Sequence, residues 1–342
     1  MLRTLLSRKR GVAVGAALTL LLTATACSSG GAAPKGDTGA DFTPPERVTA
    51  LVHTAAGGGA DLLARQIIAM MEKEKIIKPG SWTVENREGG GGAVVLSYLR
   101  EQSARSDIVA FSSNVYFANK LITKDVNVGY GDFTPIVSLY DDVMAVAVAA
   151  DGLYKTLTEF IDAAKASPGK LVQSGGSLSG TDALSGYALQ EVTGAKWQFL
   201  SFPGGGDRRT ALLRGDSQLY MTEPADMEEY VKSGDMIPVA IMGGERVSIF
   251  PDTPSTEELG YGLGAPAQTR GVVGPPKMSA EAITYYEGLF KKLTETDSWK
   301  DFIEASVATP TFRTSKEFDA HMKQQVEDHI EIFRKSGLLV NG

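Results

Sequence analysis

Short apolar runs alternate along the chain with stretches in which apolar residues recur every three or four positions. After the first run, Leu63, Ile67 and Met71 stand four residues apart, which predicts an amphipathic helix with one buried face. Alternating strands and helices favour an α/β fold in which parallel sheets are covered by helices on both faces. The predicted strands are residues 47–54, 82–85, 108–111, 132–139, 143–149, 171–173, 198–202, 218–221 and 239–242.

Capping signals locate two of the helices. Residues 156–159 read Thr-Leu-Thr-Glu, a capping box that predicts a helix ending near Ala166. Residues 314–317 read Thr-Ser-Lys-Glu and predict a long C-terminal helix that ends near Lys335.

Glycine-rich turns follow several of the predicted strands. In residues 52–65 a strand ends at three consecutive glycines, Gly57 to Gly59, and a helix follows at once. Glycine has no Cβ, so a ligand can approach the backbone closely. The first N–H groups of a helix are unpaired and carry the positive end of its dipole, which suits a carboxylate or phosphate. One such turn can also be a plain connection, but the design recurs at residues 88–92, 174–181 and 203–207, which favours anion binding.

The composition is that of an ordinary globular protein. The 342 residues are enough for about two domains, and 43% of them are hydrophobic and 22% charged. The 34 basic and 41 acidic residues give a formal net charge of −7. There is no basic stripe to neutralise phosphates, so nucleic acid is not expected as a partner. A small anion remains a possible ligand because backbone N–H groups act locally.

The first 26 residues have the pattern of a secretory signal peptide. Four basic residues between Arg3 and Arg10 precede an uncharged apolar run that ends in small residues. Cys27 is the one cysteine of the chain and follows Ala-Thr-Ala, which resembles a bacterial lipobox without its usual leucine. We expect acylation at Cys27, with residues 27–45 as the lipidated end and flexible tether of a monomer at the outer face of the cell membrane. The alternative is an ordinary signal followed by an incidental thiol.

One motif favours catalysis. Residues 176–180 match G-x-S-x-G, the nucleophile turn of α/β-hydrolases, with Ser179 as the nucleophile. Such an enzyme also needs a histidine base on a loop. His53 precedes the serine, while His321 and His329 fall inside the predicted C-terminal helix. We therefore expect no enzyme and keep a secreted esterase as the alternative. No Cys/His cluster and no nucleotide motif is present, so we expect neither a metal nor a cofactor.

Many short motifs in this chain resemble those of the tripartite tricarboxylate transporter receptors, also called Bug-type solute-binding proteins. The resemblance covers roughly residues 47–335 and rests on the number and order of the motifs. The motifs are residues 57–65 (GGGADLLAR), 84–87 (VENR), 132–135 (DFTP), 167–171 (SPGKL), 180–182 (GTD), 202–207 (FPGGGD), 212–215 (LLRG), 254–260 (PSTEELG) and 270–276 (RGVVGPP).

The resemblance implies the two-domain type II periplasmic-binding-protein fold, also called the Venus-flytrap fold. Members of this family typically bind di- or tricarboxylates between the domains and deliver them to a membrane permease, which is the partner we expect. We assign residues 46–142 plus 267–342 to the first domain and residues 143–266 to the second. The strands on either side of residue 142 are read as the crossing between them. A sensor that signals through a membrane partner is a further alternative.

The chain departs from the family pattern inside the turns. Thr54 stands where phenylalanine is usual, Ala60 where a hydroxyl residue is common, and Ala183 where a histidine often occurs. Arg208 and Arg209 make the turn at residues 203–207 more basic than the family pattern. These departures affect the identity of the ligand more than its class.

Candidate ligand-binding residues lie in the turns where predicted strands end, because α/β sheets bind ligands there. The first domain contributes the turn that begins at Thr54 and the polar end of the strand at residues 108–111. The second contributes the turns around Ser179 and Gly205, with Glu223 as an acceptor for a ligand hydroxyl or ammonium. The full set is Thr54, Gly58, Gly59, Ala60, Asp61, Ser112, Ser113, Asn114, Ser177, Ser179, Gly180, Thr181, Asp182, Gly205, Gly206, Arg209 and Glu223.

Overall fold

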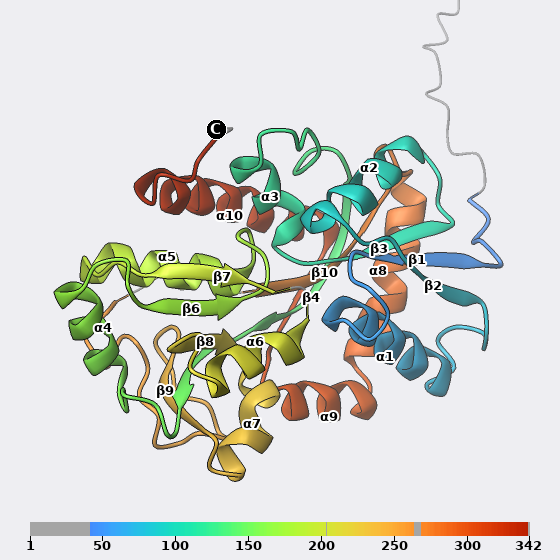
Figure 1. The fold of residues 1–342 in the computed structure, drawn as a ribbon. Helices are drawn as coiled ribbons and strands as arrows, with labels where there is room; N and C mark the ends of the chain where they lie inside the picture. Colours follow the sequence, from blue (N-terminus) through green and yellow to red (C-terminus); the bar gives the residue numbers. More distant parts are fainter. Residues whose placement is uncertain (1–41, 203, 263–267, 341–342) are drawn as a thin grey trace, which may run out of the picture. The chain divides into compact units, whose positions relative to one another are not determined.

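The strands of the described residues form two separate β-sheets, one of six strands and one of five (Figure 1). A computed structural model describes residues 42–202, 204–262 and 268–340. The predicted signal peptide, the acylation site Cys27 and the tether up to residue 41 lie outside the described residues. The six-stranded sheet has the order β11-β4-β10-β3-β1-β2, with β1 (Val48–Val52), β2 (Trp82–Asn86), β3 (Ile108–Ser112), β4 (Thr134–Asp142), β10 (Gln268–Gly274) and β11 (Thr309–Arg313).

The five-stranded sheet is built from the middle of the chain. Its strand order is β7-β6-β8-β5-β9. The strands are β5 (Ala145–Ala149), β6 (Val172–Gly175), β7 (Gln198–Ser201), β8 (Leu219–Thr222) and β9 (Met236–Ile241).

Both sheets are mixed, so the prediction of parallel sheets is wrong. β1 pairs in parallel with β2 and β3, but β10 runs antiparallel to β3 and β4. In the other sheet, β6 pairs in parallel with β7 and β8, whereas β5 is antiparallel to β8 and β9. The reason is the path of the chain. β4 leaves the six-stranded sheet and continues as β5 in the other sheet, and β10 returns from the edge at which β1 and β3 end.

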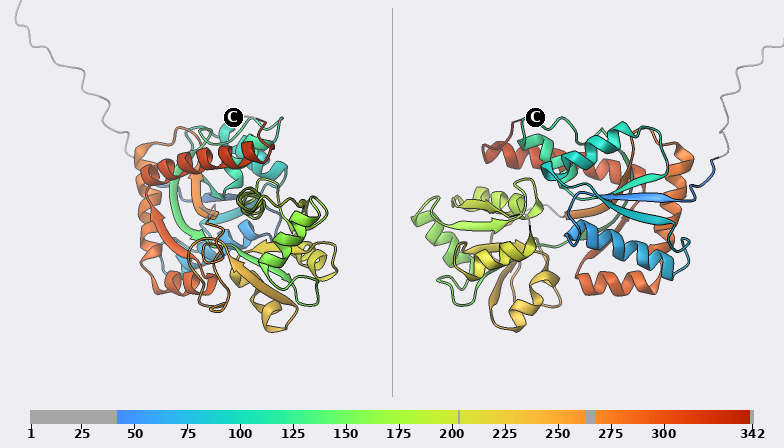
Figure 2. Two further views of the ribbon diagram at one scale, coloured as in Figure 1. Left: turned by 90° about the vertical axis from the view of Figure 1, so that its left-hand side faces the viewer. Right: turned by 45° about the vertical axis from the view of Figure 1, so that its right-hand side comes forward.

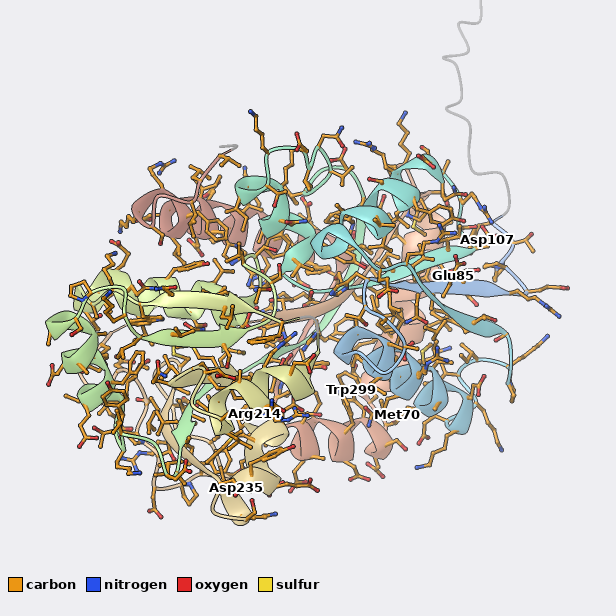
Figure 3. The ribbon with its side chains drawn as sticks, in the orientation of Figure 1. Met70, Glu85, Asp107, Arg214, Asp235 and Trp299 are labelled. Carbon is orange, nitrogen blue, oxygen red and sulfur yellow. The ribbon has the colours of Figure 1, made fainter. Side chains whose placement is uncertain are left out.

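Helices cover both faces of the six-stranded sheet, as the alternation of strand residues requires. Ala50 and Val52 belong to one apolar core, and Leu51 between them belongs to another. Met70 of α1 and Trp299 of α9, labelled in Figure 3, both contribute to the first of these cores. The helices of this core are α1 (Gly59–Lys73), α8 (Ala280–Thr294) and α9 (Asp297–Ser306), and those of the opposite face are α2 (Ala93–Glu101), α3 (Val115–Ile122) and α10 (Ser315–Lys335).

The five-stranded sheet is covered in the same way. Val146 and Val148 of β5 belong to one core, while Ala145 and Ala147 face the other. The first core is closed by α4 (Leu157–Ala166) and α5 (Thr181–Thr193), and the second by α6 (Gly205–Leu213) and α7 (Pro224–Lys232).

Both predicted capping boxes are confirmed. The Thr156 hydroxyl accepts the Glu159 N–H, and the Glu159 carboxylate accepts the Thr156 N–H, at the start of α4. The Glu317 carboxylate accepts the Thr314 N–H at the start of α10. These two helices end at Ala166 and Lys335, as predicted.

Helix α10 joins the covering helices of the two sheets. Phe333 near its end packs with Leu121 of α3 and with Leu184 and Tyr187 of α5. Figures 1 and 2 both show α10 lying beside α5. The first turn of α5 is therefore fixed relative to helices that cover the six-stranded sheet.

His329 gives the fold a pH dependence that can be tested. Its ring is 1% exposed and stacks on Phe117, with 5.4 Å between ring centroids. Burial lowers the pKa of His329 to about 3 from 6.5, so the unfolded chain takes up a proton below pH 6.5 and the folded chain does not. At pH 5 this uptake costs about 2 kcal/mol of stability.

We expect His329→Phe to lose less stability than the wild type between pH 7 and pH 5, by about 2 kcal/mol. Urea unfolding at the two pH values measures this difference. An unchanged pH dependence in the variant would contradict this account of His329.

Candidate functional site

The ends of strands from both sheets lie where the chain crosses between them. β10 begins at the edge at which β1 and β3 end, because it is antiparallel to β3. β4 runs parallel to these strands, ends at the same edge and continues as β5. β8 is antiparallel to β5, so it ends where β5 begins. The turns after β1, β3, β6 and β8 therefore lie at the edges where α/β proteins bind their ligands.

The turn before α1 is held by Asp61, whose side chain is 3% exposed. Its Oδ2 atom accepts the Gly57 N–H at 2.9 Å, and its Oδ1 atom accepts Asn86 Nδ2 and Arg65 Nε, each at 3.0 Å. The Asp61 N–H in turn donates to the Thr54 hydroxyl at 3.2 Å. The hydrogen bond from Arg65 contributes most to lowering the pKa of Asp61 to about 2. The side chains of Asp61 and Thr54 thus shape the turn.

Two backbone donors at the start of α1 remain available. The N-cap is Gly58, and the helix begins at Gly59. Among the described residues, the N–H groups of Gly59 and Ala60 have no acceptor. These N–H groups lie at the positive end of the helix dipole, so the turn can bind an anion.

The turn before α5 repeats this arrangement in the other sheet. Asp182, also buried, accepts the Gly176 N–H at 2.6 Å and the Ala183 N–H at 3.0 Å. Burial raises the pKa of Asp182, and the nearby charge of Arg208 opposes that shift. Within the described part of the chain, the first N–H groups of α5, those of Thr181 and Asp182, lack an acceptor.

Ser179 does not have the surroundings of a hydrolase nucleophile. Its side chain is fully buried, and its hydroxyl lies 3.0 Å from the Ser177 hydroxyl. No contact between Ser179 and a histidine occurs in the described residues. A serine nucleophile needs both access to substrate and a base, so the geometry gives no support to the esterase alternative.

Asn114 and Thr181 connect the two halves of the predicted site. Asn114 is the N-cap of α3, is fully buried, and donates from Nδ2 to the Thr181 hydroxyl at 3.3 Å. Its Oδ1 atom accepts the Thr269 N–H of β10 at 3.2 Å. The Thr181 hydroxyl donates to Gln268 Oε1 at 3.1 Å. The structure therefore brings together candidates from the turns after β3 and β6.

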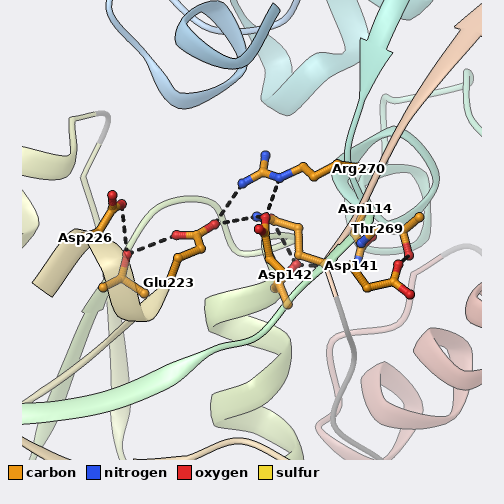
Figure 4. Close-up of polar contacts among 10 residues, drawn as sticks. Asn114, Asp141, Asp142, Glu223, Asp226, Thr269 and Arg270 are labelled. Carbon is orange, nitrogen blue, oxygen red and sulfur yellow. Dashed lines mark hydrogen bonds and ion pairs between the residues drawn. The ribbon is translucent and has the colours of Figure 1, made fainter. Parts of the chain in front are cut away.

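An ion-pair network lies beside these residues (Figure 4). Arg270 of β10 donates from Nε to Asp142 Oδ2 at 2.5 Å and from Nη2 to Glu223 Oε1 at 2.8 Å. Gln268 Nε2 donates to the same two carboxylates, at 3.2 and 2.7 Å. Burial raises the pKa of Asp142 to about 6, a shift that Arg270 opposes and the charge of Glu223 increases. Glu223 was predicted as a site residue, but Arg270, Asp142 and Gln268 were not.

The remaining candidates lie at the end of β3 and in α6. Ser112, Ser113 and Asn114 are all buried at the end of β3, and the Ser112 hydroxyl has no partner among the described residues. Arg209 lies over the ring of Tyr230, with its guanidinium carbon 5.3 Å from the ring centroid. Gly205 and Gly206 form the first turn of α6 behind its N-cap, Gly204.

His53, at the end of β1, was not among the candidates. Burial and the positive charge of Arg270 lower the pKa of His53 to about 4, which keeps its ring neutral at pH 7. The described residues contain no cluster of acidic, histidine or cysteine side chains that could hold a metal ion. None of the described helices has the length and apolar character needed to cross a membrane.

A groove of about 660 Å³ is formed by other residues. It is lined by α9, β11 and the segment at residues 245–248, and by none of the predicted site residues. The predicted site residues therefore do not line that groove.

Several solved structures share the arrangement of these sheets and helices. The periplasmic binding protein BugD matches with a TM-score of 0.74 and 20% identity, over 86% of this chain and 99% of BugD. R. palustris Rpa4515 with adipate matches with a TM-score of 0.75 and 20% identity, over 86% of this chain and 98% of the other. MatC from Rhodopseudomonas palustris with bound malate matches with a TM-score of 0.74 and 17% identity, over 85% of this chain and 99% of the other. The fold is that of the two-domain type II periplasmic binding proteins, as predicted.

The sequence comparisons define the family. The model of the tripartite tricarboxylate transporter family receptors, TctC, matches residues 63–338, so the chain belongs to this family of receptors. A UPF0065 protein from the gbd 5' region of Cupriavidus necator is 24% identical over 93% of this chain and 95% of its own length. Protein BugT of Bordetella pertussis is 24% identical over 87% of this chain and 91% of its own length. The predicted resemblance is confirmed.

Proposed function

We propose that this receptor captures a small organic anion, a di- or tricarboxylate, outside the cytoplasm and delivers it to a tripartite tricarboxylate-type permease. The observation that carries the proposal is the pair of helix starts at α1 and α5. Each presents two backbone N–H groups without an acceptor in the described structure, and the two helices belong to different sheets. A ligand with a carboxylate at each end needs two opposed groups of donors of this kind.

In this proposal each end of the ligand has its own binding turn. One carboxylate accepts the N–H groups of Gly59 and Ala60, and the other those of Thr181 and Asp182. The hydroxyls near Ser177 add side-chain donors between them, and Asn114 holds the Thr181 side chain in place. The other predicted residues, among them Gly58, Gly180, Gly205 and Arg209, shape or border the same space. The adipate and malate of the two Rhodopseudomonas structures support a ligand of this class.

Ligand capture would then involve the two predicted domains, residues 46–142 plus 267–342 and residues 143–266. The separate sheets of the described structure are compatible with such a division. A buried carboxylate must have all its hydrogen bonds made, which favours closure of the domains over the ligand.

The proposal includes attachment of a monomer to the outer face of the membrane through acylated Cys27 after removal of residues 1–26. It is supported by the sequence pattern of the N-terminus. Intact-mass analysis of membrane-extracted protein tests it. A mass that corresponds to an unmodified thiol, or to cleavage elsewhere, would contradict acylation.

Thermal unfolding with a panel of organic acids tests the proposed binding. A ligand at a hundred times its Kd stabilises the folded state by about 2.7 kcal/mol, which corresponds to a rise of about 5 °C in Tm for a chain of this size. We expect one or a few di- or tricarboxylates to give such a rise, and matched diamides to give none. If no acid shifts Tm at millimolar concentration, the proposed function is wrong.

A further inference from the structure

Arg270 is a largely buried cation whose guanidinium is held by two carboxylates. Its side chain is 15% exposed, and its partners Asp142 and Glu223 are 6% and 23% exposed. Asp142 ends β4 of the six-stranded sheet, whereas Glu223 is the N-cap of α7, which covers the other sheet. The guanidinium is therefore fixed by a carboxylate of the six-stranded sheet and by one at the start of a helix that covers the five-stranded sheet.

One nitrogen of this guanidinium points elsewhere. The Nε and Nη2 atoms carry the two ion pairs, and the described residues offer Nη1 no acceptor. Nη1 is also not among the buried polar atoms that lack a partner. Figure 4 shows the third nitrogen of Arg270 directed away from both carboxylates, on the side where the α1 segment lies.

The charge of Arg270 reaches the start of the α1 turn. It contributes to the lowered pKa of His53, the residue that follows β1 and directly precedes Thr54. The positive charge of Arg270 therefore acts on the residue that directly precedes the turn whose Gly59 and Ala60 N–H groups are available for an anion.

Guanidinium geometry explains what such an arrangement can recognise. The group is planar, and each edge with two N–H donors matches the two oxygens of a carboxylate. Asp142 and Glu223 fix the plane, and Gln268 Nε2 donates to both of them. The remaining N–H groups of Nη1 and Nη2 are thus oriented before a ligand arrives, which reduces the entropy cost of binding.

We propose that Arg270 binds one carboxylate of the ligand directly, together with the backbone N–H groups at the start of α1, and that it determines the preference for a diacid. This inference rests on the proposed function and names a residue of the same site.

Arg313 provides a matched comparison. It also pairs with an aspartate of β4, Asp141, through Nη1 at 3.3 Å and Nη2 at 2.8 Å. Its Nη1 atom also contacts the Ser138 hydroxyl and Thr311. Both Nη atoms of Arg313 are engaged within the protein, so Arg313 has a structural role and serves as the control.

The test is isothermal titration of the full chain with adipate and malate, and with the monoamide of each. In the wild type, replacing one carboxylate by an amide should weaken binding about tenfold or more. In the double variant Glu223→Gln/Arg270→Gln, the same replacement should change the affinity by less than about threefold. The double variant removes both charges of one ion pair, which avoids an unpaired Glu223. The variant Arg270→Lys keeps the positive charge but loses the paired N–H donors of the guanidinium. Its discrimination between diacid and monoamide should lie between that of the wild type and that of the double variant.

The controls separate the possible failures. Arg313→Lys should keep the tenfold discrimination, and the Tm of each unliganded variant reports whether it folds. If the wild type binds the diacids but both Arg270 variants retain full discrimination, the inference is wrong and the proposed function stands. If the wild type binds diacid and monoamide equally, the inference is also wrong. If the wild type binds none of the acids, the proposed function fails together with the inference.

Discussion

Replacing Asp142 by alanine is expected to lower the free energy of unfolding by about 3–5 kcal/mol. Asp142 is 6% exposed and accepts Arg270 Nε at 2.5 Å and Gln268 Nε2 at 3.2 Å. Without it, the buried guanidinium keeps Glu223 as its one ion-pair partner in the described structure. A buried cation that loses a carboxylate also loses the interaction that offsets its desolvation.

The second substitution of a double-mutant cycle identifies the cause. Asp142→Ala/Arg270→Met also removes the cation that has lost one of its two carboxylates, so it should regain much of the lost stability. The control is Asp107→Ala, which breaks an exposed pair with Arg105 and should cost less than about 1 kcal/mol. Urea unfolding at pH 7 measures all three variants. A double variant as unstable as Asp142→Ala would contradict the ion-pair explanation.

Replacing Asp61 by alanine is expected to disable the turn before α1. The Gly57 N–H and the Asn86 amide would each lose a hydrogen bond in a partly buried position, while the Asn86 amide keeps its bond to the Thr54 carbonyl, so the cost should be about 1–2 kcal/mol. Because Asp61 holds the turn that presents the Gly59 and Ala60 N–H groups, the affinity for a diacid should fall at least about tenfold. The pKa of Asp61 is lowered, so the stability that its charge contributes is complete above pH 4 and is lost as the pH falls towards 2. The comparison therefore belongs at pH 7.

Arg65→Ala is the matched control for Asp61→Ala. Arg65 pairs with the same carboxylate, but its side chain is 52% exposed. Its removal should leave ligand binding and most of the stability intact. Titration calorimetry and urea unfolding report the two effects separately. Equal losses of affinity and stability in Asp61→Ala and Arg65→Ala would show that these effects come from the ion pair and not from the hydrogen bonds of the turn.

Much of the fold could be predicted from local patterns. The structure confirms the strands that begin near residues 47, 82 and 108. It also confirms the capped helices that follow Thr156 and Thr314 and the glycine turns before α1 and α5. The antiparallel direction of β5 was missed because it follows from the crossing of the chain between sheets. β10 was not predicted as a strand, since Gln268–Gly274 contains two glycines and only two apolar residues. β11 was also missed, since Thr309–Arg313 is a polar edge strand that contains Pro310 and has no alternating apolar residues.

The site was harder to predict than the fold for a physical reason. Asp61 and Asp182 lie in the predicted turns, but the hydrogen bonds that occupy their carboxylates become visible only in three dimensions. Arg270 and Asp142 are separated by 128 positions, and their contact depends on the pairing of β10 with β4. The signal for Arg270 depends on the strand Gln268–Gly274, which the sequence patterns did not predict. Once that strand is known, an arginine inside it needs a nearby carboxylate, because a charge is rarely buried without a partner.

Equilibrium dialysis of the purified full chain against isotope-labelled malate and adipate tests the central claim most directly. We expect saturable uptake of at least one of these acids, with one molecule bound per chain, and half-saturation of Asp61→Ala at a concentration at least about tenfold higher. No saturable uptake by the wild type up to millimolar concentration, or an unchanged half-saturation concentration in Asp61→Ala, would contradict it.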